Sequence, residues 1–129
     1  MPRLQFLCIS NNPLGDEGLA PLVAPGVLPP TLTHFYPYAN QLTDVGLSSL
    51  LANVKLCRTL EVLNLSSNGI SDAGCAALVA ACDRGALPTL SQLIVSGNPA
   101  STMAQEKARL AAFGKAAAQT EFSNSLTAV

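Results

Sequence analysis

A single histidine and four cysteines are the residues of this chain best suited to catalysis or metal binding. The sequence has no C-x-x-C pair, and His34 is not near a cluster of further ligand types, which argues against a zinc site. No acidic residue is placed to orient His34, so a surface or interface histidine is the favoured interpretation. We therefore predict no enzymatic activity, no cofactor and no metal.

The cysteines are Cys8, Cys57, Cys75 and Cys82, and their even number permits disulfides. Cys75 and Cys82, however, take places that other segments give to leucine or valine at helical spacing. Buried free thiols are therefore favoured over a disulfide framework, and they suit a reducing, intracellular (cytoplasmic) setting. Cys8 is expected to be a partly exposed thiol with no positive charge placed to lower its pKa.

An asparagine ends the same nine-residue phrase four times along the chain. Steps of 28, 28 and 30 residues separate these asparagines, which are Asn12, Asn40, Asn68 and Asn98. A fixed period of this length is typical of a solenoid, in which each repeat packs on its neighbours. Because an asparagine side chain offers two donors and an acceptor, the stacked copies are predicted to bond the turns of adjacent repeats as a ladder.

Each repeat is predicted to contain a short strand followed by a helix. Apolar residues at the first, fourth and sixth places of the phrase, as in Leu60, Leu63 and Leu65, indicate a strand with one buried face. Ser, Thr and Asp then precede apolar residues at helical spacing and are predicted to be helix N-caps. A glycine recurs in the first turn of these helices, which indicates close packing against the neighbouring repeat.

The second repeat and the first helix depart from this pattern. Pro37 stands where an inward aliphatic residue belongs, so we expect either a missing hydrogen bond or a shifted strand. Pro21 and Pro25 interrupt the first helix, which is expected to have only one or two turns. The second helix is expected to carry its inward residues at Leu47, Leu50, Leu51 and Val54.

The fourth repeat is predicted to end in a capping helix. Its D-x-G sequence is missing, and a plausible capping box opens an alanine-rich helix over about residues 101–118. Met103, Leu110 and Phe113 are among the apolar positions of this helix. The helix is predicted to supply the terminal cap that a solenoid requires, and residues 119–129 are predicted to form a frayed tail.

The pattern L-x-x-L-x-L-x-x-N-x-L followed by D-x-G-x-x-x-L resembles the leucine-rich repeat family, specifically the long-repeat subtype of ribonuclease inhibitor. The resemblance covers about residues 4–100. It implies an α/β fold, a short right-handed horseshoe with parallel β-strands on the concave face and α-helices on the convex face. It also implies that the chain binds other proteins. The repeats of a domain over residues 1–118 are placed at about 4–31, 32–59, 60–89 and 90–100.

Alternate strand residues are predicted to point out from the concave face. Nine of them are predicted to bind a partner: Phe6, Cys8, His34, Tyr36, Tyr38, Val62, Asn64, Gln92 and Ile94. Phe6, Tyr36 and Tyr38 are half of the aromatic residues of the chain, and exposed aromatic side chains are typical of an interface core. Irregular packing around Pro37 and contact with a missing N-terminal extension are the alternative interpretations.

The predicted function is a non-enzymatic recognition or scaffold module for a protein partner. A net charge of −1 with scattered lysine and arginine argues against nucleic acid, and no apolar stretch approaches the roughly 18–20 residues of a membrane span. One alternative is a regulator of an enzyme, such as a GTPase-activating repeat protein, in which Arg58 or Arg84 acts from a loop. A second alternative is homo-oligomerisation through the uncapped N-terminal edge; that bare edge also suggests a fragment of a longer repeat protein.

Overall fold

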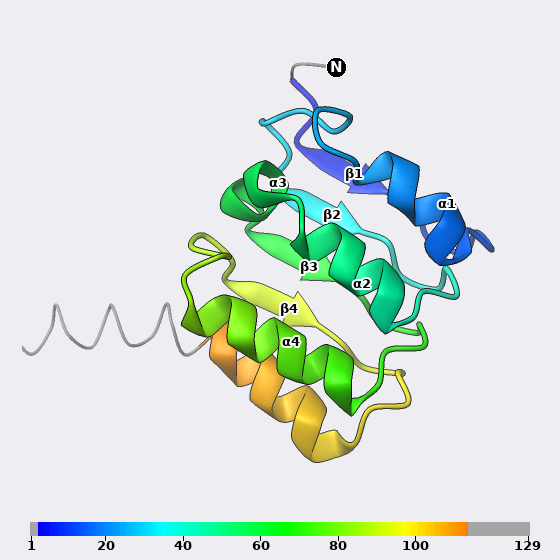
Figure 1. Ribbon diagram of the computed structural model, residues 1–129, viewed down its shortest axis with the longest axis vertical. Helices are drawn as coiled ribbons and strands as arrows, with labels where there is room; N and C mark the ends of the chain where they lie inside the picture. The colour runs from blue at the N-terminus through cyan, green and yellow to red at the C-terminus, as the bar shows by residue number, and fades with distance from the viewer. Residues whose placement is uncertain (1–2, 114–129) are drawn as a thin grey trace, which may run out of the picture.

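The computed structural model describes residues 3–113, in which a parallel sheet forms one layer and helices form the other (Figure 1). The strands lie side by side in chain order and are β1 (Phe6–Cys8), β2 (His34–Tyr36), β3 (Val62–Asn64) and β4 (Gln92–Ile94). The helices are α1 (Gly15–Leu22), α2 (Asp44–Leu51), α3 (Val54–Thr59) and α4 (Asp72–Asp83). Residues 102–113 are also helical. The predicted α/β solenoid with parallel strands is confirmed.

The register of the sheet follows the repeat period. Phe6 lies opposite His34, His34 opposite Val62, and Val62 opposite Gln92. The next residue of each strand points into the core between the layers, where the side chain of Phe35 is fully buried. Residues one repeat apart therefore form straight columns across the sheet, as the sequence pattern predicts.

Pro37 removes one hydrogen bond without shifting β2. The Ile9 N–H donates to the Tyr36 carbonyl (3.3 Å), and the Leu65 N–H donates to the Ile94 carbonyl (2.7 Å). Pro37 has the same place in the second repeat and has no N–H to donate. Its ring is buried at the inward position. Of the two outcomes expected for this proline, the missing hydrogen bond is the correct one.

The helical segment of the second repeat is broken in two, which the sequence pattern did not predict. α2 ends at Leu51, and α3 begins after Asn53. The Asn53 side chain is buried; it accepts from the Leu56 N–H (3.1 Å) as the N-cap of α3 and donates to the Val23 carbonyl (2.8 Å). Val54, which was expected to face inward, is therefore exposed at the start of α3.

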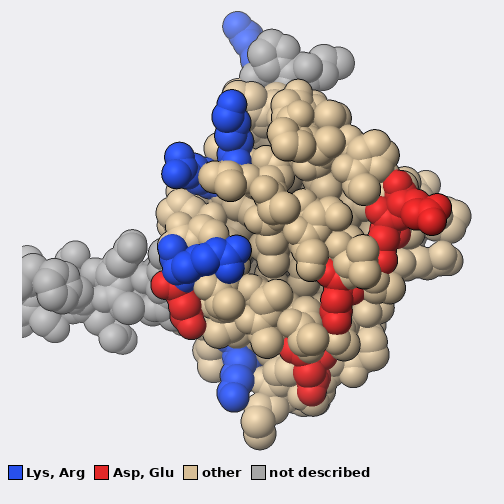
Figure 2. Space-filling view, in the orientation of Figure 1, with Lys and Arg blue, Asp and Glu red and all other residues tan. Residues whose placement is uncertain are grey.

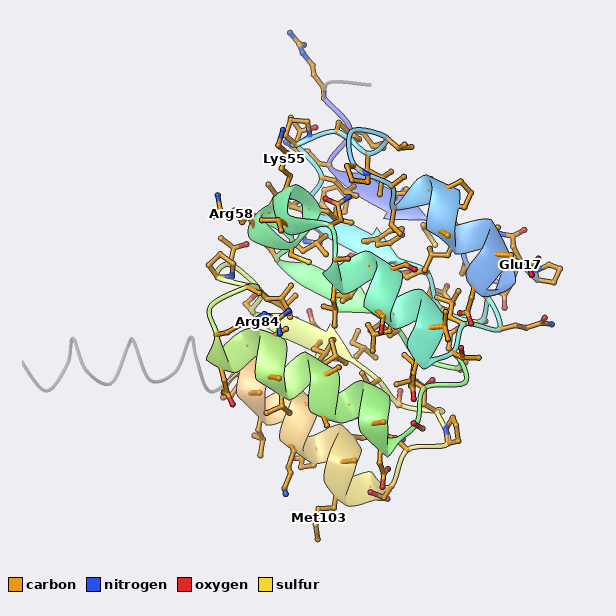
Figure 3. The ribbon with its side chains drawn as sticks, viewed as in Figure 1. Glu17, Lys55, Arg58, Arg84 and Met103 are labelled. Atoms are coloured by element: carbon orange, nitrogen blue, oxygen red, sulfur yellow. The ribbon has the colours of Figure 1, made fainter. Side chains whose placement is uncertain are left out.

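The helix over residues 102–113 packs through alanines. Ala108 and Ala112 are buried in the core. Met103, Leu110 and Phe113, which are apolar positions of the predicted capping helix, are all exposed, and Met103 projects away from the body of the molecule in Figure 3. The rest of the predicted cap and the predicted tail, residues 119–129, lie outside the described residues.

The predicted capping box forms only in part. The Ser101 hydroxyl accepts from the Ala104 N–H (3.1 Å), as an N-cap should. In a complete capping box the Ser101 N–H would donate to a Glu or Gln side chain of its own helix. Here it donates to the Asp72 carboxylate of the preceding repeat (2.6 Å). The Gln105 side chain instead donates to the Asn98 carbonyl (3.1 Å) and to a second carbonyl of the preceding turn. The start of this helix is therefore bonded to the third repeat and to its own turn.

Candidate functional site

The recurring asparagines hold the turns that follow the strands. The Asn68 Oδ1 accepts from the N–H groups of Asn40 (2.9 Å) and Leu42 (3.0 Å), one repeat earlier. Its Nδ2 donates to the carbonyl of Pro37 (3.2 Å) in that repeat and to that of Leu65 (3.1 Å) in its own. One side chain thus bonds the backbone of two repeats, which fixes where each strand ends.

The same arrangement recurs at Asn98 but is incomplete at Asn40. The Asn98 Oδ1 accepts from the N–H groups of Asn68 (3.1 Å) and Ile70 (3.0 Å). The Asn40 Nδ2 donates to the Ile9 carbonyl (2.8 Å), but its Oδ1 is buried without a partner within residues 3–113. An unpaired buried acceptor of this kind costs about 1–3 kcal/mol. The junction between the first two repeats therefore lacks the hydrogen bonds that the Oδ1 atoms of Asn68 and Asn98 accept at the other two junctions.

The turn of the first repeat explains the incomplete bonding at Asn40. There the Leu14 N–H donates to the carbonyl of Asn12 (2.8 Å), whereas its counterparts in the second and third repeats donate to an asparagine side chain. The Gly15 N–H donates to the main-chain carbonyl of Asn40 (2.8 Å). The Asn12 side chain bonds only carbonyls of its own phrase. The predicted ladder thus runs between repeats from Asn40 onward.

A second ladder, made by aspartates, joins the helix starts. The Asp16 carboxylate accepts from the N–H groups of Thr43 (2.8 Å) and Gly46 (3.0 Å) and from the Thr43 hydroxyl. A Cβ on Gly46 would overlap the Asp16 Oδ1. The glycine is therefore needed because a carboxylate from the neighbouring repeat occupies the space of a side chain.

This second ladder continues through the third repeat to the last helix. The Asp44 carboxylate accepts from the Ser71 N–H (2.9 Å) and hydroxyl, and a Cβ on Gly74 would overlap its Oδ1. Asp72 then accepts from the N–H of Ser101. These aspartates are not the N-caps of their own helices that the sequence pattern predicts; Thr43 and Ser71 fill that role. Their spacing of 28 residues was the signal that could have revealed the ladder.

The two ladders hold the strands so that a row of aromatic rings crosses the outward face of the sheet. The Phe6 side chain is 55% exposed and stacks on His34, with ring centroids 4.1 Å apart and planes 27° apart. The Tyr36 ring lies 6.3 Å from that of His34. The Thr33 hydroxyl lies 2.8 Å from the His34 Nδ1 and helps to fix the imidazole. Phe6, His34 and Tyr36, which lie on β1 and β2, are here called the aromatic row.

The remaining predicted contact residues lie on the same outward face. Val62, Asn64, Ile94 and Tyr38 are partly buried, and Gln92 is exposed. The Asn64 Oδ1 accepts from the N–H (3.0 Å) and hydroxyl (2.7 Å) of the residue two places later, so this side chain is held in place. None of the nine predicted contact residues is Asp, Glu, Lys or Arg. The face therefore offers rings, aliphatic groups and uncharged hydrogen-bonding groups.

Cys8 is the exposed thiol of this face, and hydrogen bonds lower its pKa. The Ser10 hydroxyl lies 3.3 Å from the Cys8 Sγ; bonds from the side chain and backbone of Ser10, and then from the Tyr38 hydroxyl, favour the thiolate. The expectation that nothing lowers this pKa took only positive charges into account and is wrong, because these hydrogen bonds lower it. Burial instead raises the pKa of Cys57 to about 11. The four cysteines, all within residues 3–113, form no disulfide bonds.

Charged side chains lie on the edges of the molecule instead. Lys55, Arg58 and Arg84 follow one edge, and Glu17 lies on the opposite edge (Figure 3). Figure 2 shows the helix layer, with most acidic residues on the side of Glu17 and most basic residues on the opposite side, where an acidic residue also lies beside them. Arg58 belongs to the last turn of α3, so its predicted position in a loop is wrong, whereas Arg84 directly follows α4.

The part of the chain that the structure describes, residues 3–113, has no group of three or more His, Cys, Asp or Glu residues arranged to hold a metal ion. Its helices fall short of the length and apolar character that crossing a membrane requires.

Two segments of the chain match a family profile described as "Leucine Rich repeat". Residues 3–23 contain β1 and α1, and residues 56–79 contain β3 and most of α4. No curated protein matches the chain. Repeats of this family generally mediate protein–protein interaction, and the family is typically non-enzymatic. The matched segments, the parallel sheet and the helix layer together show that this chain folds as a leucine-rich repeat solenoid.

Proposed function

We propose that this protein is a recognition module that binds a protein partner through the outward face of its strands, centred on the aromatic row. The observation that carries the proposal is the exposure of Phe6 in a rigid stack with His34. Aromatic side chains supply large contact areas at low entropic cost, and they are frequent in the centres of interfaces. The backbone beneath them is fixed by the asparagine ladder, so little further ordering is needed on binding.

The partner surface is expected to be uncharged and partly apolar. The nine predicted contact residues carry no acidic or basic side chain, so a charged partner group placed there would lose water without gaining an ion pair. Polar groups of Asn64, Gln92 and Tyr38 provide hydrogen bonds around the apolar centre. This composition favours a partner segment with aromatic or aliphatic side chains flanked by amides or hydroxyls.

The proposal also includes the long-repeat subtype of the family. Each of the four strands is followed by an α-helix within residues 3–113, and the asparagines recur every 28 or 30 residues. Both features support a solenoid in which a full helix occupies the convex side of every repeat.

The test compares Phe6→Asp with Val45→Asp as a matched control. Both residues are exposed apolar residues, but Val45 lies on α2 in the helix layer. A partner captured by the immobilised wild-type protein, once identified, is titrated with all three proteins by calorimetry. We expect Phe6→Asp to weaken binding at least about tenfold, which is ~1.4 kcal/mol, and Val45→Asp to bind as the wild type does. Equal affinity for Phe6→Asp and wild type would refute the proposed face.

A further inference from the structure

Asn68, whose side chain bonds the second repeat to the third, is followed in the sequence by glycine. It is the one asparagine of the chain with this neighbour, whereas Asn12 and Asn98 are followed by proline. Because glycine has no side chain, its nitrogen reaches the amide carbon of a preceding asparagine with little steric hindrance. Proline has no N–H and cannot react in this way. The pair Asn68–Gly69 is therefore the place in this chain best suited to spontaneous deamidation.

This reaction consumes water and needs no other reactant. The Gly69 nitrogen bonds to the Asn68 Cγ, the Cγ–Nδ2 bond breaks, and the amide proton of Gly69 leaves with Nδ2 as ammonia. Water then opens the resulting cyclic imide at either of its carbonyl carbons. A water molecule is consumed and an ammonia molecule is released, with no oxidation or reduction. The product at position 68 is aspartate or isoaspartate.

The backbone of Leu42 holds both reacting groups in the folded protein. Its N–H donates to the Asn68 Oδ1 (3.0 Å), and its carbonyl accepts from the Gly69 N–H (2.5 Å). The leaving group is held as well, because the Asn68 Nδ2 donates to the carbonyls of Pro37 (3.2 Å) and Leu65 (3.1 Å). The Gly69 nitrogen cannot attack until its N–H leaves the Leu42 carbonyl. Cyclisation therefore requires the hydrogen bonds between the second and third repeats to open.

The product of the reaction cannot restore these hydrogen bonds. The Asn68 Nδ2 donates to the carbonyls of Pro37, Leu65 and Ser66. An aspartate places an acceptor oxygen there, facing other acceptors. Isoaspartate also adds a methylene to the main chain, directly after Ser67, whose φ is 56°. A chain that has reacted therefore loses the asparagine bonds of this junction permanently.

We propose that Asn68–Gly69 is a deamidation site controlled by the asparagine ladder. The pair is protected while the second and third repeats are bonded, and each opening of their junction allows irreversible conversion. Asn98 strengthens this protection, since its Oδ1 accepts from the N–H groups of Asn68 (3.1 Å) and Ile70 (3.0 Å), on either side of Gly69. The proposal is independent of partner binding at the aromatic row.

Mass-spectrometric peptide mapping of the full chain tests the proposal, because it separates asparagine, aspartate and isoaspartate at position 68. The wild type, Asn98→Ala and the control Asn12→Ala are incubated at neutral pH, in native buffer and in guanidinium chloride. We expect the wild type to convert at least about tenfold more slowly in native buffer than in denaturant. In native buffer, Asn98→Ala should convert at least about fivefold faster than the wild type. Asn12→Ala should match the wild type, because its side chain bonds only its own phrase.

Two further measurements complete the test. Circular dichroism verifies that each variant is folded in native buffer. Gly69→Ala should slow conversion in denaturant, where the ladder is absent, because a side chain then hinders the attacking nitrogen. An unchanged rate in that variant would contradict the cyclic-imide route.

The protection by the ladder has its own contrary outcomes. Equal rates for the wild type in native buffer and in denaturant would show that the folded junction does not protect the pair. Equal rates in native buffer for the wild type and a folded Asn98→Ala would show that Asn98 does not control the opening. Purified deamidated protein that refolds with the stability of the wild type would contradict the permanent loss of the junction.

Discussion

At the scale of single residues, one backbone conformation is repeated after every strand. Asn11, Ala39, Ser67 and Gly97 occupy equivalent places and have φ angles of 59°, 57°, 56° and 73°. Left-handed backbone is costly for residues with a Cβ, by about 1–2 kcal/mol, yet three of the four residues have one. In the second, third and fourth repeats the asparagine that follows supplies hydrogen bonds between turns, whereas Asn12 bonds only its own phrase. Contacts between repeats therefore support the left-handed backbone of Ala39 and Ser67, which have a Cβ.

The asparagine ladder leads to a prediction for Asn68. Asn68→Ala leaves the N–H groups of Asn40 and Leu42 without their acceptor, so it should lower the free energy of unfolding by about 1–3 kcal/mol. Asn12→Ala is the matched control, because the Asn12 side chain bonds only its own phrase and is exposed. Urea unfolding followed by circular dichroism measures both. Equal losses for the two variants would refute a ladder between repeats.

The sequence identified the asparagines because the residue and its turn belong to one phrase. The aspartates were harder to interpret, since Asp16 lies in a helix start but bonds the helix start of the next repeat. The unpaired Oδ1 of Asn40 could not be predicted either. It is unpaired because the Leu14 N–H donates to the Asn12 carbonyl instead, and the sequence does not show which acceptor that N–H uses. Periodicity reveals which residues recur; it does not say which neighbour each one bonds.

At the scale of elements, the helices are placed by small residues. Gly46 and Gly74 allow a carboxylate of the previous repeat to enter the first turn, and the last helix packs through Ala108 and Ala112. Close approach of this kind leaves no space for larger side chains. Large apolar residues such as Leu110 are consequently on the outside of the last helix, where it faces away from the core.

The close approach of the Asp16 carboxylate to Gly46 in α2 predicts that a substitution by a better helix former destabilises the protein. Alanine is the better helix former by about 1 kcal/mol, yet Gly46→Ala should lower the free energy of unfolding by about 1–3 kcal/mol, because its Cβ meets the Asp16 carboxylate. In the control Gly18→Ala, the added Cβ would lie 2.9 Å from the Leu14 Cδ2 and 3.1 Å from the Leu14 Cβ, which are less severe contacts than the closer one to the Asp16 Oδ1 at Gly46. Its loss should be smaller. Thermal unfolding measures both, and a Gly46→Ala protein as stable as the wild type would contradict this packing.

The strands could be predicted from the sequence pattern, but some features of the helices could not. Strand positions were predictable because the alternation of apolar residues is short and strict. The break between α2 and α3 was not, since Asn53 reads as an ordinary polar residue until the Val23 carbonyl is seen beside it. The residues through which the last helix packs were not identified for a related reason, because they are the small residues Ala108 and Ala112, which permit close packing.

At the scale of the whole molecule, charge and apolar surface are separated. Most basic side chains lie on one side of the helix layer and most acidic side chains on the other (Figure 2), while the predicted contact residues on the strands carry no acidic or basic side chain. A face of this composition binds by shape and apolar contact, and charged edges around it add little affinity at physiological ionic strength. The architecture thus presents one uncharged face on a rigid sheet.

Site-specific photo-crosslinking tests the central claim, that the partner binds at the aromatic row. A benzophenone amino acid is introduced at position 36, in place of the partly buried Tyr36, and separately at position 45, in place of the exposed Val45 on α2. Each protein is irradiated with the captured partner, and the products are mapped by mass spectrometry. The proposal predicts crosslinks from position 36 and none from position 45; crosslinks from position 45 alone would contradict it.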